Sequence, residues 1–258
     1  MLRTLEATRD EDIITSSRSE GILIERILAG PGCRLSNAAA ACLPLFHKLT
    51  HVALHGPGIN DAGVTFLERQ IKTLKCLDLS GTRITGQVGA TLAQFTNLEQ
   101  FYASGTQFDD AGLKAIAPLG QRLERLDLSA TRLTCAGLAH LRQLQKLVEL
   151  SLANIDFAQA GQQSGAFAQA IQHLLALADH LKVLDLTAVG LNNPGLIVLS
   201  QLKELTDLLI SDNPKAGYDG LKQFPKTTKL ARLVAERTGL KPKERNAFES
   251  NLGRQLLY

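Results

Sequence analysis

Aromatic side chains and methionine are scarce in this sequence of 258 residues. It has no tryptophan, one methionine, nine phenylalanines and three tyrosines. Branched aliphatic side chains must therefore fill the core, and the 47 leucines supply most of them. A core built from nearly one residue type favours a repeated packing unit over an irregular globule.

Other absences exclude whole classes of protein. No apolar run reaches about 18 residues, so we expect no transmembrane helix and no insertion into a membrane. The first twenty residues, MLRTLEATRDEDIITSSRSE, carry scattered charges and no apolar centre, which is unlike a Sec-type signal peptide. The four cysteines form no CxxC pair and are too few for a disulfide framework, so the sequence indicates a reducing compartment.

A self-similar segment recurs along most of the chain. Three copies show it most clearly: LKCLDLSGTRIT from Leu74, LEQFYASGTQFD from Leu98 and LERLDLSATRLT from Leu123. The same frame starts again at Leu49, Leu147, Leu181, Leu205 and Leu230. The starts lie 24 or 25 residues apart, except for 34 residues between Leu147 and Leu181.

Each copy predicts one strand and one helix. Apolar residues alternate in L-x-x-L-x-L, which is typical of a short strand with residues such as Leu77 and Leu79 on one side. The return segments place apolar residues three or four apart, as at Leu113, Ile116 and Leu119, which indicates a short helix. Because a helix is wider than a strand, the stacked units should bend with the sheet on the inner face.

The repeat resembles the leucine-rich-repeat superfamily, whose units span about 20–29 residues. The continuations GTQFDDAGLKAI and ATRLTCAGLAHL are similar to the bacterial and cysteine-containing types. The resemblance covers about residues 23–240. It implies a right-handed α/β solenoid of eight or nine repeats, with a parallel β-sheet on the concave face and short helices on the convex face.

The resemblance also implies a function, which is protein–protein interaction without catalysis. Bacterial proteins with such repeats include effectors delivered into host cells. We therefore expect a cytoplasmic protein, or one delivered into a host cell by a non-Sec route. An enzyme system such as a ubiquitin-ligase-type effector, in which the repeats serve recognition, is one alternative. An inert structural spacer is the other.

The ends and one interval depart from the repeat. Residues 1–22 predict a tail or an N-terminal cap, because an open solenoid end exposes apolar surface. Residues 241–258 predict a capping helix with Phe248, Leu252, Leu256 and Leu257 at helical spacing. The long interval places an insertion within 153–180, which is either a lengthened helix or a partner-binding protrusion.

The position of the charges identifies no charged partner. Residues 215–258 sum to +6 and residues 1–214 to −3. No base-stacking aromatic residue accompanies the basic end, so we expect no nucleic-acid partner. The chain is expected to be a monomer that binds a protein.

The sequence offers no catalytic, metal or cofactor site. His51 and His55 resemble a ligand pair, but on a predicted strand four residues span about 13 Å, too far for one metal ion. No His or Asn is placed to orient a nucleophilic cysteine, and no phosphate-binding glycine loop or hydrolase elbow occurs in its required context. We expect no enzyme activity, no cofactor and no metal.

The outward strand positions form the predicted binding surface, because they are free of packing and would lie on a preformed face. Tyr102 and Arg125 are the main candidates, since Tyr and Arg often carry interface energy. A solvated face with no partner is the competing interpretation. The predicted partner-binding residues are His51, His55, Asp78, Gln100, Tyr102, Arg125, Asp127, Glu149, Asp185, Asp207 and Arg232.

Overall fold

A computed structural model describes residues 4–7, 9–17, 24–30, 32–157, 166–224 and 228–252. The chain divides into two compact units, Met1–Arg132 and Leu133–Tyr258. Each unit repeats a short strand followed by helical turns. None of the described helices has the length and hydrophobicity needed to span a bilayer.

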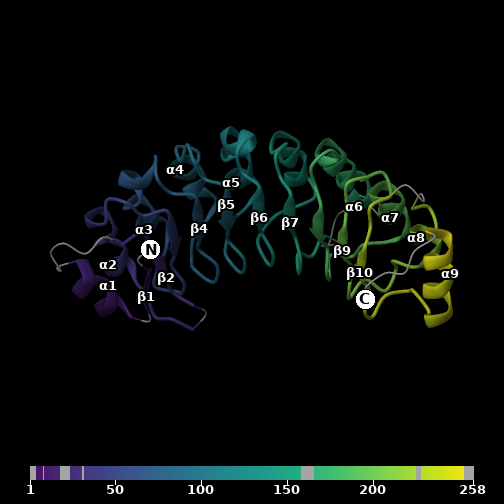
Figure 1. Cartoon of the computed structure of the whole chain (residues 1–258), viewed down its shortest axis with the longest axis horizontal. Helices are drawn as coiled ribbons and strands as arrows, with labels where there is room; N and C mark the ends of the chain where they lie inside the picture. The colour runs from purple at the N-terminus through teal and green to yellow at the C-terminus, as the bar shows by residue number, and fades with distance from the viewer. Residues whose placement is uncertain are drawn as a thin grey trace. The chain divides into compact units, whose positions relative to one another are not determined.

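The first unit contains parallel strands that pair in sequence order. They are β1 (Thr4–Glu6), β2 (Arg26–Leu28), β3 (His51–Ala53), β4 (Cys76–Asp78), β5 (Gln100–Tyr102) and β6 (Arg125–Asp127). The α-helices are α1 (Asp10–Ser17), α2 (Asn37–Ala40), α3 (Asp61–Thr65), α4 (Gly89–Leu92) and α5 (Asp110–Ala115). The 3-10 helices are η1 (Leu43–Leu45), η2 (Glu68–Gln70), η3 (Gly86–Val88) and η4 (Ala117–Gln121). Figure 1 shows β4, β5 and β6 side by side, with α4 and α5 beyond one side of them.

The second unit has the same plan. Its strands are β7 (Glu149–Ser151), β8 (Val183–Asp185), β9 (Asp207–Leu209) and β10 (Arg232–Val234), which also pair in parallel and in order. Its helices are η5 (Gly137–Gln143), α6 (Ala166–Ala170), η6 (Ile171–Leu177), α7 (Asn193–Leu199), α8 (Tyr218–Leu221) and α9 (Pro242–Leu252). Several return segments are thus 3-10 helices, which suits connections of only three to seven residues.

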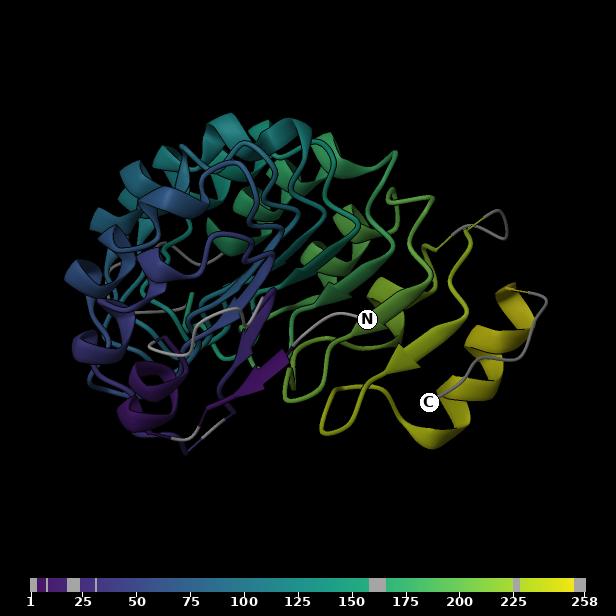
Figure 2. The same cartoon turned by 60° about the vertical axis from the view of Figure 1, so that its left-hand side comes forward.

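Two expected features at the ends of the repeat region can be located. Within residues 1–22, β1 pairs with β2, and Ile13 of α1 is fully buried. At the other end α9 follows β10 (Figure 2), and Phe248 packs edge-on against Phe224 with ring centroids 6.1 Å apart. Leu256 and Leu257, and residues 158–165 of the predicted insertion, lie outside the described residues.

Leucines at the repeat positions build the core. Leu74, Leu77 and Leu79 are fully buried, and Leu126 is 2% exposed. In register across the sheet, Leu77 lies opposite Phe101, which lies opposite Leu126. Burial of each such side chain contributes about 1.5–3 kcal/mol. The inward direction that alternation predicts for these residues is confirmed.

Each repeat turns sharply after its strand, through a residue with positive φ. The φ angles are 69° at Gly81, 51° at Ala130 and 55° at Ala188. Glycine reaches this left-handed conformation without strain, whereas the Cβ of an L-residue costs about 1–2 kcal/mol there. The same repeat position is occupied by Gly56, Gly81, Gly105, Ala130, Asn154, Ala188, Asp212 and Arg237.

Replacing Ala130 by glycine should therefore stabilise the protein. Relief of the strain exceeds the added entropy of the unfolded chain, so we expect a gain of about 0.5–1 kcal/mol in the free energy of unfolding. Urea denaturation measures it. Ala41→Gly is the control, because Ala41 has φ −61° and its replacement should lower stability. A loss of stability in Ala130→Gly would mean that the turn has a different conformation.

A polar side chain closes most of these turns. The hydroxyl groups of Thr82, Thr106, Thr131 and Thr238 each donate to the carbonyl oxygen three residues earlier, at 2.6–3.0 Å. These threonines occupy the ninth position of their repeats, counted from the leucine that starts each copy, and they satisfy backbone groups left unpaired where the strand ends.

Asn213 satisfies the turns of two repeats. Its Nδ2 group donates to the carbonyl oxygens of Leu186 and Ile210, at 2.8 and 2.9 Å. Its Oδ1 atom accepts from the amides of Val189 and Leu191, at 3.2 and 2.8 Å. Val189 occupies the ninth position of the preceding repeat and has no polar side chain. The fully buried Asn213 supplies the missing bonds from the next repeat.

Asn213→Ala should consequently be among the most damaging substitutions in the second unit. It leaves several buried backbone groups without partners, so we expect a loss of about 3 kcal/mol or more. Thr238→Ala, at the same repeat position, removes only one donated and one long accepted bond of a hydroxyl group and should cost about 1 kcal/mol. Urea denaturation of both variants tests the difference, and equal losses would contradict this role of Asn213.

Candidate functional site

The open face of the first unit is the side of its sheet opposite the buried central residue of each strand, and most strand residues on it are half-buried. Strand register orders these residues in two rows. The first row runs Arg26, His51, Cys76, Gln100 and Arg125. The second row runs Leu28, Ala53, Asp78, Tyr102 and Asp127. Six of the predicted residues thus share this face of the first unit.

The open face of the second unit is defined in the same way. Its first row is Glu149, Val183, Asp207 and Arg232, and its second row is Ser151, Asp185, Leu209 and Val234. Arg232 lies 4.0 Å from Asp207. Leu209 and Val234 are neighbours in register and half-buried, and they form an apolar pair that the prediction did not include. The sequence did indicate this pair, because both residues occupy the outward repeat position that holds Asp in earlier repeats.

Three aspartates among the predicted partner-binding residues have a structural role. The Oδ1 atoms of Asp78, Asp127 and Asp185 each accept the backbone amide two residues further on, at 2.9 Å. This bond closes an Asx turn at the end of the strand. One oxygen of each carboxylate is therefore committed to the fold, and these residues are less available to a partner than the sequence suggested.

His55 is buried and paired. It lies two residues beyond the end of β3, so the expectation that it is a strand residue is wrong. It is 9% exposed, and its Nε2 atom lies 2.9 Å from Oδ2 of Asp78. Burial alone would raise the pKa of Asp78, but the close approach of His55 and the hydrogen bonds from Ser80 outweigh burial and hold that pKa below its usual value.

The first row contains a neutral imidazole and a protonated thiol. Burial, followed by the charges of Arg26 and Lys75, lowers the pKa of His51, whose Nδ1 atom lies 2.9 Å from Oγ1 of Thr50. Burial, followed by the charge of Asp78, raises the pKa of the Cys76 thiol to about 11. Cys76 is therefore a poor nucleophile at neutral pH. Within the described ranges, no three His, Cys, Asp or Glu side chains gather as metal ligands.

Gln100 contacts Tyr102 and is the neighbour of Arg125 in the sheet. The Tyr102 hydroxyl donates to Oε1 of Gln100 at 3.2 Å, and Gln100 lies directly opposite Arg125 in the sheet. Tyr102 is half-buried and Arg125 is exposed. The structure thus brings together the two residues that the sequence singled out, on neighbouring strands.

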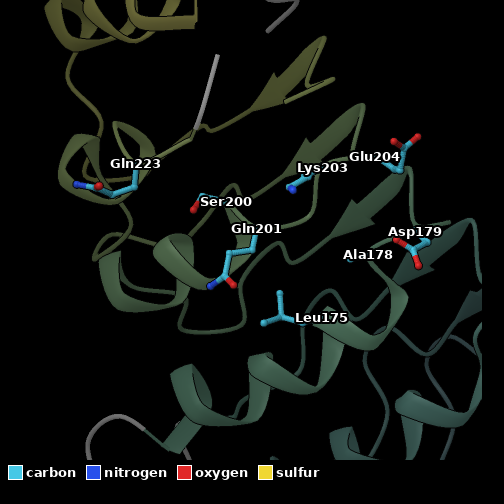
Figure 3. Close-up of a pocket in the computed structure, with 8 residues that line it drawn as sticks. All are labelled: Leu175, Ala178, Asp179, Ser200, Gln201, Lys203, Glu204 and Gln223. Carbon is cyan, nitrogen blue, oxygen red and sulfur yellow. The ribbon is translucent and has the colours of Figure 1, made fainter. Parts of the chain in front are cut away.

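Each unit also contains a cavity. The one in the first unit measures about 430 Å³ and is lined by Gly32, Cys33, Arg34, His55, Gly56, Pro57, Ser80 and Gly81. The one in the second unit measures about 590 Å³, and Figure 3 shows Leu175 and Gln201 on facing sides of it. Its other lining residues are Ala178, Asp179, Ser200, Lys203, Glu204 and Gln223, a mixture of both charge signs. The sequence predicted neither cavity.

Local ion pairs take up much of the positive charge near the chain end. Lys229 lies 2.6 Å from Glu204, and Lys222 lies 2.6 Å from Asp219. Arg237 pairs through two nitrogens with Asp212. Each of these three positive charges is therefore paired locally with its own carboxylate.

Comparison with solved structures identifies the fold class. The chain has the leucine-rich-repeat fold, with a repeat of 24 or 25 residues and parallel strands that pair in sequence order. One similar structure is an internalin, InlF, from Listeria monocytogenes, with a TM-score of 0.57 and 15% identity, covering 90% of this chain and 79% of that one. Another is internalin C2 from the same species, with a TM-score of 0.52 and 22% identity, covering 83% and 80%. No protein-family model and no curated protein sequence matches the chain.

The pairing of Asp78 with His55 should make stability depend on pH. Because the folded-state pKa of Asp78 lies below its unfolded value of 3.8, its contribution is complete above that value and is lost as pH falls through the folded pKa. Asp78→Asn should therefore cost about 1 kcal/mol or more at pH 7 and progressively less below pH 3.8.

Urea denaturation across this pH range tests the expectation. Asp127→Asn is the matched control, because Asp127 makes the same turn bond while the structure describes no histidine beside it. A cost for Asp78→Asn that stays constant down to acid pH would show that the carboxylate does not contribute as proposed.

Proposed function

We propose that the protein is a non-catalytic module that binds a protein partner through the open face of its sheet. The observation that carries the proposal is the arrangement of Tyr102, Gln100 and Arg125 on neighbouring strands of the first unit. An aromatic ring and a guanidinium group on short paired strands are positioned before a partner arrives. Binding then orders little chain, which lowers its entropic cost.

The chemistry of this face favours recognition over catalysis. Asp78 is engaged by both His55 and the Ser80 amide, and the Cys76 thiol is held in its protonated form. Neither arrangement activates a nucleophile for attack. The internalin structures agree with the fold and identify no partner for this chain.

The cysteines support a reducing location. Cys33, Cys42, Cys76 and Cys135 are all free thiols. Proteins in oxidising compartments commonly pair such residues, whereas cytosolic proteins keep them reduced. We propose a cytoplasmic protein, either of the producing cell or of a host cell that receives it.

Site-specific photocrosslinking tests the proposed face. Tyr102→benzoylphenylalanine places the reactive group on the open face. Lys114→benzoylphenylalanine, at an exposed position of α5, is the control on the helical side. We expect a discrete crosslinked protein from cell lysate with the first variant and not with the second. The same product from both variants, or from the control alone, would contradict the assignment.

Once that protein is identified, Tyr102→Ala combined with Arg125→Ala should weaken its binding at least about 10-fold, or 1.4 kcal/mol. The unfolding free energy should change by less than about 1 kcal/mol, because Arg125 is exposed and Tyr102 is only half-buried. Lys114→Ala should leave affinity unchanged. Isothermal titration calorimetry measures all three, and wild-type affinity in the double variant would refute the role of the two residues.

A further inference from the structure

The cavity of the first unit lies where the carboxyl ends of β2, β3 and β4 run into three successive turns. Gly32, Gly56 and Gly81 each belong to one of these turns and all three line the cavity. The volume of about 430 Å³ falls within the range of about 300–1,000 Å³ found for small-molecule sites.

One wall of this cavity, at Gly56, is closely packed backbone, whereas Gly32 and Gly81 have open space beside them. Gly56 has φ +116°, and a Cβ atom added to it would lie 2.6 Å from the carbonyl oxygen of Cys33. The amide of Gly81 donates to the carbonyl oxygen of Ser104 at 2.7 Å, and the amide of Cys33 donates to Gly30 at 3.2 Å. The Gly56 turn therefore packs against the preceding turn at Cys33, and the Gly81 turn is bonded to the repeat that follows it.

A fixed imidazole forms part of the lining. His55 is 9% exposed, and its Nε2 atom faces the Asp78 carboxylate at 2.9 Å. Asp78 is itself held by the Ser80 amide, and Ser80 lines the same cavity. A carboxylate behind an imidazole fixes the ring orientation. The Cys33 thiol donates to the carbonyl oxygen of Ala7 at 3.3 Å, so it lines the cavity as a weakly polar group.

The charge of the lining indicates the ligand class. Among the described lining residues, Arg34 has a permanent positive charge, and none of these lining residues is acidic. Its side chain is exposed, and no ion pair joins it to a carboxylate in the part of the chain that the structure describes. Much of the remaining lining is apolar, with Pro57 and the α-carbons of the three glycines. An apolar body and one negative charge complement these surfaces.

We propose that this cavity binds a compact organic acid with an apolar body, with its carboxylate on Arg34 and its body against Pro57 and the glycine turns. Arginine suits this role, because its planar fork matches a carboxylate in two parallel hydrogen bonds. The same chemistry belongs to a free small acid and to the C-terminal residue of a peptide. The site does not depend on the proposed protein-binding face.

A nuclear magnetic resonance titration of the full chain tests the site. The probes are 3-phenylpropionate and its uncharged amide, and the amide signals of Gly32, Gly56 and Gly81 are the readout. We expect saturable shifts at these glycines with the acid and at least about 10-fold weaker binding of the amide. Arg34→Gln should remove the preference for the acid. Arg83→Gln, at an exposed arginine outside the lining, should keep it.

A blocking variant separates the cavity from general surface binding. Ser80→Phe places a large ring at the lining and should abolish the glycine shifts, whereas Ser104→Phe, at the same repeat position of the next repeat, should keep them. Equal affinity for acid and amide, shifts spread over the whole protein, or unchanged binding by Ser80→Phe would each overturn the proposal.

The source of the ligand is distinguished by a third probe, acetyl-Ala-Ala-Phe with a free carboxylate. Tighter binding than 3-phenylpropionate at the three glycines assigns the site to a peptide C-terminus, and weaker binding assigns it to a free acid. Both results require the same cavity and the same arginine. Failure of the crosslinking experiment on Tyr102 would leave this titration unaffected, so the two proposals stand or fall separately.

Discussion

Stacking of buried leucines is the interaction on which the rest of this structure depends. Every described strand has three residues, too few to persist alone. Each becomes stable because its central side chain, such as Leu77 or Leu126, is buried between the sheet and the helical turns. Neighbouring repeats supply the backbone partners and the apolar surface at the same time. A repeat protein of this kind is stabilised by its internal and nearest-neighbour contacts.

The turns that follow the strands have structural and functional roles that overlap. Threonine hydroxyls, Asn213 and three aspartates satisfy the backbone where the chain leaves the sheet. Residues beside them then become available for recognition. His55 and Asp78 show the overlap most clearly, because their pair supports the turn after β4 and also one wall of the cavity.

The sequence located the strands and the inward leucines well, because both follow from the alternation of apolar residues, which is visible within a single copy of the repeat. It identified Tyr102 and Arg125 as outward residues for the same reason. It missed the pairing of His55 with Asp78, which lie 23 residues apart and meet only when two repeats stack. The cavity was missed on similar grounds, since it forms where three turns come together. The apolar pair Leu209 and Val234 was left out of the predicted binding residues because the prediction selected polar and charged outward residues.

The central claim is that a partner covers the open face. Hydroxyl-radical footprinting tests this claim most directly. It is applied to the complex with the partner identified by crosslinking, and the oxidation of two tyrosines is measured. Tyr102 lies on the open face of the first unit, whereas Tyr218 begins helix α8, and both are half-buried. The account predicts that complex formation reduces oxidation of Tyr102 and leaves Tyr218 unchanged. Protection of Tyr218 with no change at Tyr102 would contradict it.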